Sequence, residues 1–263
     1  MSGTQRDDAV RVYWQPGSTA GMQAKEFLTK RGVPFISRNI LADKTALDEL
    51  APFGIRRAPI VTRGDRWADG QVLADVAELV GLPPLEVTLL PPDELHRRLN
   101  LFFDATQRYL AQLSDEQLDT LQPNRPRSYR DLIFHIYNIA DGFVEQGYGI
   151  PLHFESYNRY GGPVMEPRRA LAGYGCRVQA ELNRWFAANG GSADWTAPAE
   201  VYYGRQTLHE FLERTAWHSG QHVRQLIWAM DRMEVEPDGR LGKDAFQGLP
   251  MPETIWEEDL AED

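Results

Sequence analysis

Two histidines four residues apart give this chain its clearest potential for chemistry. His218 and His222 lie in the stretch from Thr207 to Met233, whose apolar residues recur mostly at helical spacing. One helical turn brings the two side chains about 40° apart around the axis, so both can reach a single ion. Neutral imidazole binds zinc, nickel and iron well. The pair therefore predicts half of a divalent metal site.

The spacing is also compatible with a pair of histidines that binds no metal. No glutamate follows His218, so the helix lacks the motif of a metalloprotease. His209 lies half a turn away from His218 and cannot join the same site. A third ligand therefore has to come from another part of the chain.

Length and composition restrict the classes of protein to be considered. The 263 residues predict two domains, and a hydrophobic content of 42% is that of a globular protein with a core. No apolar run is long enough for a membrane span, and the polar start MSGTQRDDAV does not resemble a signal peptide. The single cysteine, Cys176, excludes an internal disulfide and favours a cytoplasmic location.

Charge gives a further restriction. The net charge is −10, and part of it comes from an acidic tail between Pro252 and Asp263. No basic stripe interleaved with aromatic residues is present, so we expect neither nucleic acid nor membrane as a partner. The sequence leaves the oligomeric state open and allows a homodimer.

The first 88 residues predict a small α/β domain in which strands alternate with helices. Runs rich in β-branched and aromatic residues indicate strands, and apolar residues at helical spacing indicate the helices between them. The predicted order is βαβαββα. Its strands are Val10–Trp14, Val33–Ile40, one that begins at Ala58–Val61, and Arg66–Ala68, and its helices are Ser18–Arg31, Lys44–Pro52 and Val72–Val80.

This segment resembles the glutaredoxin branch of the thioredoxin fold, through VYWQPGSTAGMQAKEFLTKRGVPF and RRAPIV. In that family a cysteine motif stands where this chain has Ser18 and Gly21. A hydroxyl cannot replace a thiolate in disulfide exchange, so redox catalysis is not expected here. Pro59 matches the family's cis-proline. The resemblance implies that Ser18, Ala58 and Pro59 line a groove for a thiol ligand.

Basic residues near this edge leave two interpretations open. Arg56, Arg57, Arg63 and Arg66 could attract a carboxylate-bearing ligand. Alternatively, they form a solvated surface on a purely structural domain. The segment GLPPLEVTLLPP from Gly81 to Pro92 then predicts a linker packed on its neighbours, with the domain boundary near residue 88.

The second domain, residues 89–263 with the acidic tail, is predicted to be all-α. Four amphipathic helices imply a four-helix bundle. The sequences SYRD and TLHE at the starts of two of them are capping boxes. The predicted helices are Asp93–Leu113, Ser128–Gln146, Met165–Ala188 and Thr207–Met233.

The second of these helices carries His135, within RDLIFHIYNI, and a bundle can bring it opposite the pair on the last helix. The domain then resembles the DinB-like (YfiT-like) family over residues 93–233, through DLIFHI and WHSGQHVRQL. The resemblance implies that His135, His218 and His222 bind a divalent metal, with zinc expected and nickel or iron as alternatives. Three protein ligands leave coordination positions open, as in catalytic sites.

Other polar residues near these positions have weaker claims. Asp131 is interpreted as a helix cap rather than a ligand, and Asn138 and Gln221 either orient a bound water or lie on an ordinary helix surface. Cys176 is predicted to be a small buried core residue. The long loop from Gly147 to Pro163 carries four aromatic residues and is the predicted place for a substrate.

Two functions from different classes follow. Members of the DinB-like family include thiol transferases, which implies a metal-dependent enzyme that acts on a low-molecular-weight thiol and an electrophilic substrate. No catalytic residue beyond the metal ligands is identified. The alternative is a non-catalytic, stress-associated metal-binding protein in which the degenerate glutaredoxin-like domain serves as an adaptor. The missing cysteine favours the second function, and the open coordination favours the first.

Overall fold

The computed structural model describes residues 7–256, and by its contacts the chain divides into two compact units. The first comprises residues up to Val87 together with the segment that begins at Pro252, and the second runs from Thr88 to Met251. The sequence had assigned this last segment to the helical domain. Of the predicted acidic tail, Glu253 is described, and residues 257–263 lie outside the described residues.

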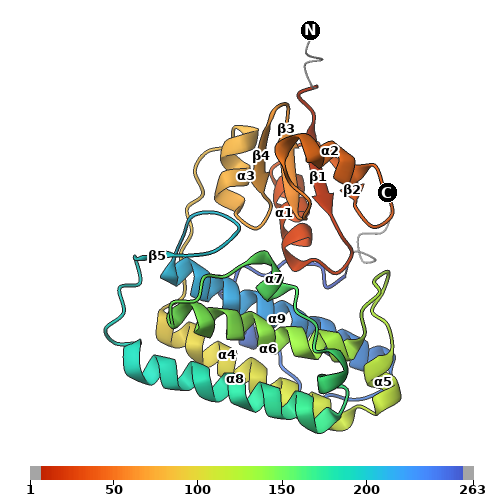
Figure 1. Cartoon of the computed structure of the whole chain (residues 1–263), viewed down its shortest axis with the longest axis vertical. Helices are drawn as coiled ribbons and strands as arrows, with labels where there is room; N and C mark the ends of the chain where they lie inside the picture. The colour runs from red at the N-terminus through yellow and green to blue at the C-terminus, as the bar shows by residue number, and fades with distance from the viewer. Residues whose placement is uncertain (1–6, 257–263) are drawn as a thin grey trace. The chain divides into compact units, whose positions relative to one another are not determined.

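The first unit is a small α/β structure built on a mixed sheet (Figure 1). The strands are β1 (Val10–Trp14), β2 (Ile36–Asn39), β3 (Ile60–Arg63) and β4 (Arg66–Asp69), in the order β2-β1-β3-β4. β1 pairs in parallel with β2 and antiparallel with β3, and β3 pairs antiparallel with β4. This arrangement fits a thioredoxin-like fold.

Helices connect these strands in the predicted order, and their apolar faces complete the core. They are α1 (Thr19–Lys30), α2 (Ala46–Leu50), a 3₁₀ turn at Ala51–Phe53, and α3 (Leu73–Val80). One apolar cluster joins β1, β3, α1 and α3 through residues such as Val12, Leu28 and Val76, none of which is exposed. A second cluster forms around Tyr13, Leu50 and Ile60.

The main difference from the sequence prediction is the second strand, which begins at Ile36 rather than at Val33. It lies at the edge of the sheet and pairs only with β1 among the described strands, so fewer ladder hydrogen bonds define its start. The Ala58–Pro59 peptide bond is cis, as predicted from RRAPIV.

The segment after Met251 adds to the first unit by binding α1. The backbone amides of Glu253 and Thr254 donate to the Glu26 carboxylate at 2.8 and 2.9 Å, and the Thr254 hydroxyl donates to it at 2.6 Å. Lys30, one turn further along α1, forms an ion pair with Glu253 at 2.8 Å. The start of the acidic tail is therefore held by specific contacts.

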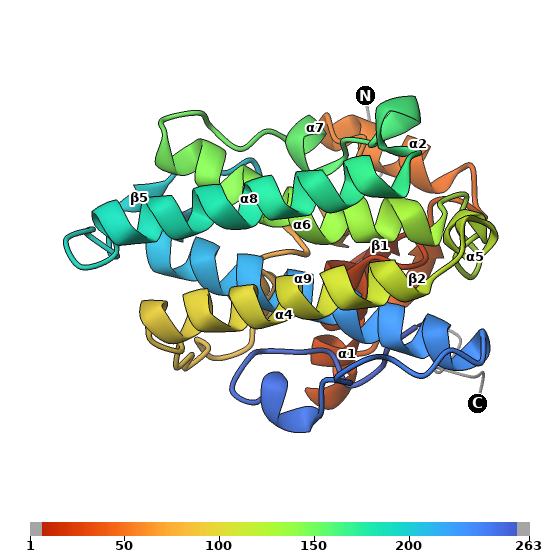
Figure 2. The same ribbon diagram turned by 90° about the horizontal axis from the view of Figure 1, so that it is seen from below.

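The second unit is helical, and its long helices lie alongside one another in both views (Figures 1 and 2). α6 packs on α8 and α9, and α4 packs on the same two helices. Short helices α5 and α7, the two-stranded pair β5 and β6, and two 3₁₀ turns connect or follow the long helices. The bounds are α4 (Pro92–Gln112), α5 (Asp115–Asp119), α6 (Tyr129–Gly147), α7 (Phe154–Tyr157), α8 (Arg168–Asn189), β5 (Pro198–Ala199), β6 (Gln206–Thr207) and α9 (Leu208–Arg232), with 3₁₀ turns at Gly162–Met165 and Lys243–Ala245.

The starts of α6 and α9 are fixed by the capping boxes that the sequence predicted. The Ser128 hydroxyl accepts from the backbone of Asp131, whose carboxylate accepts from the Ser128 backbone. Thr207 and Glu210 make the same exchange. Each box satisfies backbone donors that a helix start leaves free, which fixes where the helix begins. None of the helices in the described chain is both long and apolar enough to cross a membrane.

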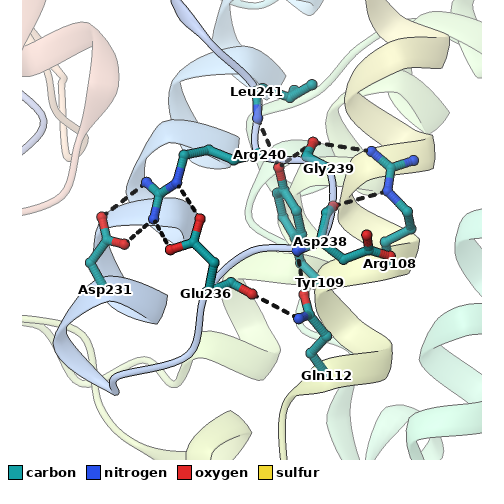
Figure 3. A network of polar contacts seen from close by, with 9 residues as sticks. All are labelled: Arg108, Tyr109, Gln112, Asp231, Glu236, Asp238, Gly239, Arg240 and Leu241. Carbon is teal, nitrogen blue, oxygen red and sulfur yellow. Dashed lines mark hydrogen bonds and ion pairs between the residues drawn. The ribbon is translucent and has the colours of Figure 1, made fainter.

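The chain beyond α9 returns along α4 and is fastened there by polar contacts (Figure 3). Arg108 donates to the carbonyl of Asp238 at 3.1 Å, and Gln112 donates to the carbonyl of Glu236 at 2.8 Å. Arg240 forms ion pairs with Asp231 and Glu236. These contacts hold the end of α9, the helix that carries the histidine pair, against its neighbour α4.

Cys176 does not occupy the position that the sequence predicted. Its side chain is exposed, although it lies within α8. The buried residues of that helix are spaced by one turn, at Leu171, Gly175, Val178 and Leu182. Cys176 is next to this row rather than in it, so the prediction of a buried core residue was wrong.

Candidate metal centre

The packing of α6 on α9 brings His135 to the pair formed by His218 and His222. The centroid of the His135 ring lies 5.4 Å from that of the His218 ring and 4.9 Å from that of the His222 ring. The centroids of the His218 and His222 rings are 5.0 Å apart. Each residue offers one ligand atom, and these atoms all lie within 4.8 Å of one another. The structure thus brings together the three histidines that the sequence singled out.

The three rings have the protonation state and the free lone pairs that a metal ion requires. Burial is the main cause that lowers the pKa of each: to about 3 for His222 and well below the ordinary value for His135 and His218. Each ring is therefore neutral near pH 7. Nδ1 of His135, Nδ1 of His218 and Nε2 of His222 are buried and have no hydrogen-bond partner among the described residues.

Such buried nitrogens without partners are uncommon, because a lost hydrogen bond to water costs about 1–3 kcal/mol for each group. A shared cation would satisfy all three at once. The cluster contains no carboxylate or thiolate, and a set of neutral imidazoles suits zinc, nickel or iron better than magnesium or calcium. The residues present therefore fit a divalent transition metal.

The orientation of His222 is fixed by a residue that the sequence reasoning missed. Its Nδ1 donates to Oε1 of Gln225, one turn further along α9, at 2.6 Å. This bond places the proton on Nδ1 and leaves the lone pair on Nε2. Metal-binding histidines commonly have such a partner on the second nitrogen. The sequence signal that could have indicated this role is a glutamine three residues after a predicted metal ligand, which is one helical turn away.

The polar neighbours named from the sequence have structural partners. Asp131 is the third residue of α6 and the partner of Ser128 in its capping box, as predicted. Asn138 and Gln221 are fully buried, which excludes the interpretation of an ordinary helix surface. Nδ2 of Asn138 donates to the carbonyl of Ser156 at 2.8 Å, and Oε1 of Gln221 accepts from Arg224 at 2.8 Å.

The other histidines lie apart from the cluster. His209 makes a 2.8 Å hydrogen bond to the carbonyl of Leu90, which agrees with the prediction that it cannot join the site. His96 pairs with Asn183 at 2.6 Å, and His153 is the residue before α7. None of these three belongs to the metal-competent group among the described residues.

The residues assigned to a thiol groove in the first unit lie at the start of α1 and before β3. The hydroxyl of Ser18 accepts from the backbone of Gly21 at 3.2 Å and so caps α1. Pro59 is buried and follows Ala58 across the cis bond. These positions are consistent with the predicted groove, which stays a prediction.

Three of the four arginines near that edge are engaged within the unit. Arg57 forms an ion pair with the buried Asp69 at 2.7 Å, and Arg63 forms one with Asp8 at 2.8 Å. Arg66 donates to the carbonyl of Leu79 at 3.2 Å. These contacts favour a structural role for them over the binding of a carboxylate-bearing ligand.

Comparison with known families supports the assignment of the helical unit. Residues 90–226 match the model of the DinB superfamily, and they make up half of the chain. The chain belongs to the DinB superfamily. No curated protein matches it at a significant level. The DinB region includes α4, α6, α8 and most of α9, and therefore all three histidines of the cluster.

DinB proteins typically bind a divalent metal, and the three-histidine cluster of this chain is compatible with one. The match rests on the sequence of the whole region, and the geometry rests on the positions of three side chains. The matched region contains all three histidines.

Proposed function

We propose that this DinB protein is a metal-dependent enzyme that transfers or modifies a low-molecular-weight thiol, with zinc held by His135, His218 and His222. The observation that carries the proposal is the convergence of three neutral imidazoles, two of them buried and that of His135 half-buried, that lack a fourth protein ligand in their cluster within the described chain. Structural zinc sites are usually closed by four protein ligands, whereas catalytic sites keep a position open for water or substrate.

A divalent ion in such a site supplies Lewis acidity, which keeps a thiol ionised near neutral pH although its unperturbed pKa is about 8.5. The sulfur has to come from another molecule, because the chain has one cysteine and its side chain is exposed on α8. The thiolate then forms a bond to an electrophilic carbon, and the leaving group departs with the bonding electrons.

The residues around the cluster support this function because they orient the metal ligands and keep water away from them. His222 is held by Gln225, and His218 and His222 are 7% and 2% exposed, so the ligand side of α9 is largely shielded. The loop from Gly147 to Pro163 reaches the cluster through α7, whose Tyr157 ring lies 5.8 Å from that of His218. This loop is the proposed wall for the electrophilic substrate.

The proposal extends to the folds of the two units, the cellular compartment and the oligomeric state. In this proposal the helical unit is a four-helix bundle, and the first unit is a glutaredoxin-like domain that has its own groove for a thiol ligand at Ser18, Ala58 and Pro59. Its sheet order and cis-proline support this identity. The protein acts in the cytoplasm, where its small thiol is reduced, and it works as a monomer or a homodimer.

The alternative is a non-catalytic metal-binding, stress-associated protein with the first unit as an adaptor. The role of Ser18 favours it, because its hydroxyl serves as a helix cap where an active glutaredoxin has its nucleophile. Under this alternative the metal site binds no substrate sulfur, and the first unit contributes a surface rather than a ligand groove.

Two measurements separate these functions. Metal analysis of the full chain, purified without an affinity tag, should give one divalent ion per chain. X-ray absorption at the metal edge with added small thiols should then reveal a new metal–sulfur bond near about 2.3 Å for zinc. Thiol-dependent turnover of chloro-dinitrobenzene or maleylpyruvate would support the enzyme. A first shell that stays nitrogen and oxygen at saturating thiol would support the alternative.

A further inference from the structure

One face of α1, in the first unit, carries a second stretch of the chain. Met22, Glu26 and Lys30 are spaced by four residues, so they lie on the same side of the helix. Glu253 forms an ion pair with Lys30 at 2.8 Å. The hydroxyl of Thr254 donates to the Glu26 carboxylate at 2.6 Å and lies 3.8 Å from the sulfur of Met22. The stretch therefore runs along α1 toward the start of the helix.

Residues 252–256, which we call the strap, continue beyond these contacts within the same unit. Trp256 follows Thr254 by two residues, which span at most about 7 Å of chain. The next step of four residues along α1, from Met22 back to Ser18, is about 6 Å long. Trp256 is therefore within reach of the helix start that carries Ser18. Its side chain is only 1% exposed, so a fully buried aromatic ring anchors this part of the strap.

The first turn of α1 is covered on every side. Thr19, Ala20 and Met22 are 2%, 4% and 0% exposed, and Gly21 between them is buried as well. Four consecutive residues of a helix point about 100° apart, so together they sample its whole circumference. A helix that packs on a sheet with one face leaves its outer face to solvent unless another segment covers it. The strap touches Met22 and so contributes to this cover.

The covered turn also contains a group that is better satisfied when the turn is open. Oγ1 of Thr19 is buried and has no hydrogen-bond partner among the described residues. A hydroxyl in this state is less stable than one in contact with water, so it favours opening. The ion pair of Lys30 with Glu253 opposes opening only weakly, because both side chains are more than half exposed. The hydrogen bonds to Glu26 and the burial of Trp256 are therefore the main contacts that keep the strap in place.

We propose that the strap is an autoinhibitory contact: it closes the start of α1, and a ligand must displace it to enter the groove predicted at Ser18, Ala58 and Pro59. The identity of that ligand as a thiol rests on the proposed function, whereas the closure of the helix start does not. The affinity for the ligand is then reduced in proportion to the fraction of molecules whose strap is open. A weakened strap should raise this affinity although no residue of the groove has changed.

The first test measures how accessible the start of α1 is in the full chain. Cys176→Ser removes the one native thiol, and Thr19→Cys then places a reporter in the covered turn. The rate at which iodoacetamide alkylates this reporter follows the population of the open state. Trp256→Ala and Glu26→Leu should each raise the rate about tenfold or more, because the first removes a large buried ring and the second removes hydrogen bonds to a charged group.

Two controls separate release of the strap from general unfolding. Glu253→Gln removes only the exposed ion pair and should leave the alkylation rate nearly unchanged. A reporter at Val12→Cys, in the core of the sheet, detects opening of the whole unit. A rise at Thr19→Cys without a rise at Val12→Cys supports the strap. Unchanged rates in the strap variants, or an equal rise at both reporters, would overturn it. If Trp256→Ala fails to fold, Glu26→Leu decides.

The second test connects the strap to the groove, with reduced glutathione as the probe and calorimetry as the measurement. In the otherwise native chain, Trp256→Ala should raise the affinity for glutathione about tenfold, in parallel with the alkylation rate. Equal affinity in both proteins would overturn the autoinhibition and leave a thiol groove in place. If glutathione binds to neither protein, the proposed thiol groove fails, and the alkylation rates alone decide whether the strap closes the helix start.

Discussion

His222 donates from Nδ1 to the side-chain oxygen of Gln225 at 2.6 Å, one turn further along α9. This bond selects the tautomer with the lone pair on Nε2, the nitrogen without a protein partner. It also fixes the rotation of the ring. Gln225 therefore orients the His222 ring as a metal ligand already in the metal-free protein.

Replacement of Gln225 by leucine should weaken metal binding about 10- to 100-fold, the range found when such supporting partners are removed. The ring of His222 loses its acceptor and can rotate or change tautomer. Competition with a chromophoric chelator measures the affinity. Gln225→Glu serves as the control and should retain the affinity, because a carboxylate accepts the same hydrogen bond. Unchanged affinity in the leucine variant would contradict the assigned role.

Replacement of His218 by alanine should abolish stoichiometric metal binding, because two imidazoles cannot hold the ion as three do. Elemental analysis of the untagged protein is the measurement. His209→Ala is the matched control on the same helix, since His209 instead contacts the carbonyl of Leu90. A His218→Ala protein that keeps its metal, together with a His209→Ala protein that loses it, would place the site elsewhere.

The low pKa values of the three histidines predict an unusual pH dependence. His222 stays neutral in the folded protein down to about pH 3, and His135 and His218 are also shifted well below their ordinary pKa. The unfolded chain takes up protons near pH 6.5, so the metal-free protein should lose stability as the pH falls below about 6.5. Metal affinity should change little between pH 8 and pH 6. Thermal melts and metal titrations across this range check both statements, and a metal affinity that falls steeply already at pH 7 would contradict them.

Glu213 is a buried carboxyl whose ionisation should destabilise the fold. It is 7% exposed, and burial with the nearby charge of Glu210 raises its pKa to about 7. Its contribution is favourable below the unfolded pKa of about 4.3 and is lost as the pH rises through 7. Glu213→Gln should therefore stabilise the protein at pH 8, by about 1–3 kcal/mol, and have little effect at pH 4.5. Unfolding by denaturant at both pH values is the measurement, with the exposed Glu236→Gln as control. An equal effect at both values would mean that the charge is not the cause.

The full chain should not reduce disulfides, because Ser18 occupies the position of the nucleophile and its hydroxyl caps α1. The assay is reduction of the mixed disulfide of glutathione and 2-mercaptoethanol. Cys176→Ser is the control: it removes the one thiol of the chain and should leave any metal-dependent thiol turnover nearly intact. Disulfide reduction that survives this substitution would refute the prediction.

The sequence by itself determined the features that depend on neighbouring residues. The capping boxes at Ser128 and Thr207 each join residues three positions apart, so the starts of α6 and α9 follow from local hydrogen bonds. The spacing of His218 and His222 follows from the helical repeat in the same way. The order of elements in the first unit was also readable, because strands and helices have different apolar periods.

The tertiary structure decided everything that depends on which faces meet. His135 joins the pair because α6 packs on α9, and helix spacing alone cannot give the position of one helix on another. Cys176 is exposed because it stands beside the buried row of α8, a difference of one position in sequence. Tyr157, Tyr203 and Arg214 come from three separate elements and carry no shared motif. Their contact arises only when burial brings them together, because packing joins residues by shape and not by distance along the chain.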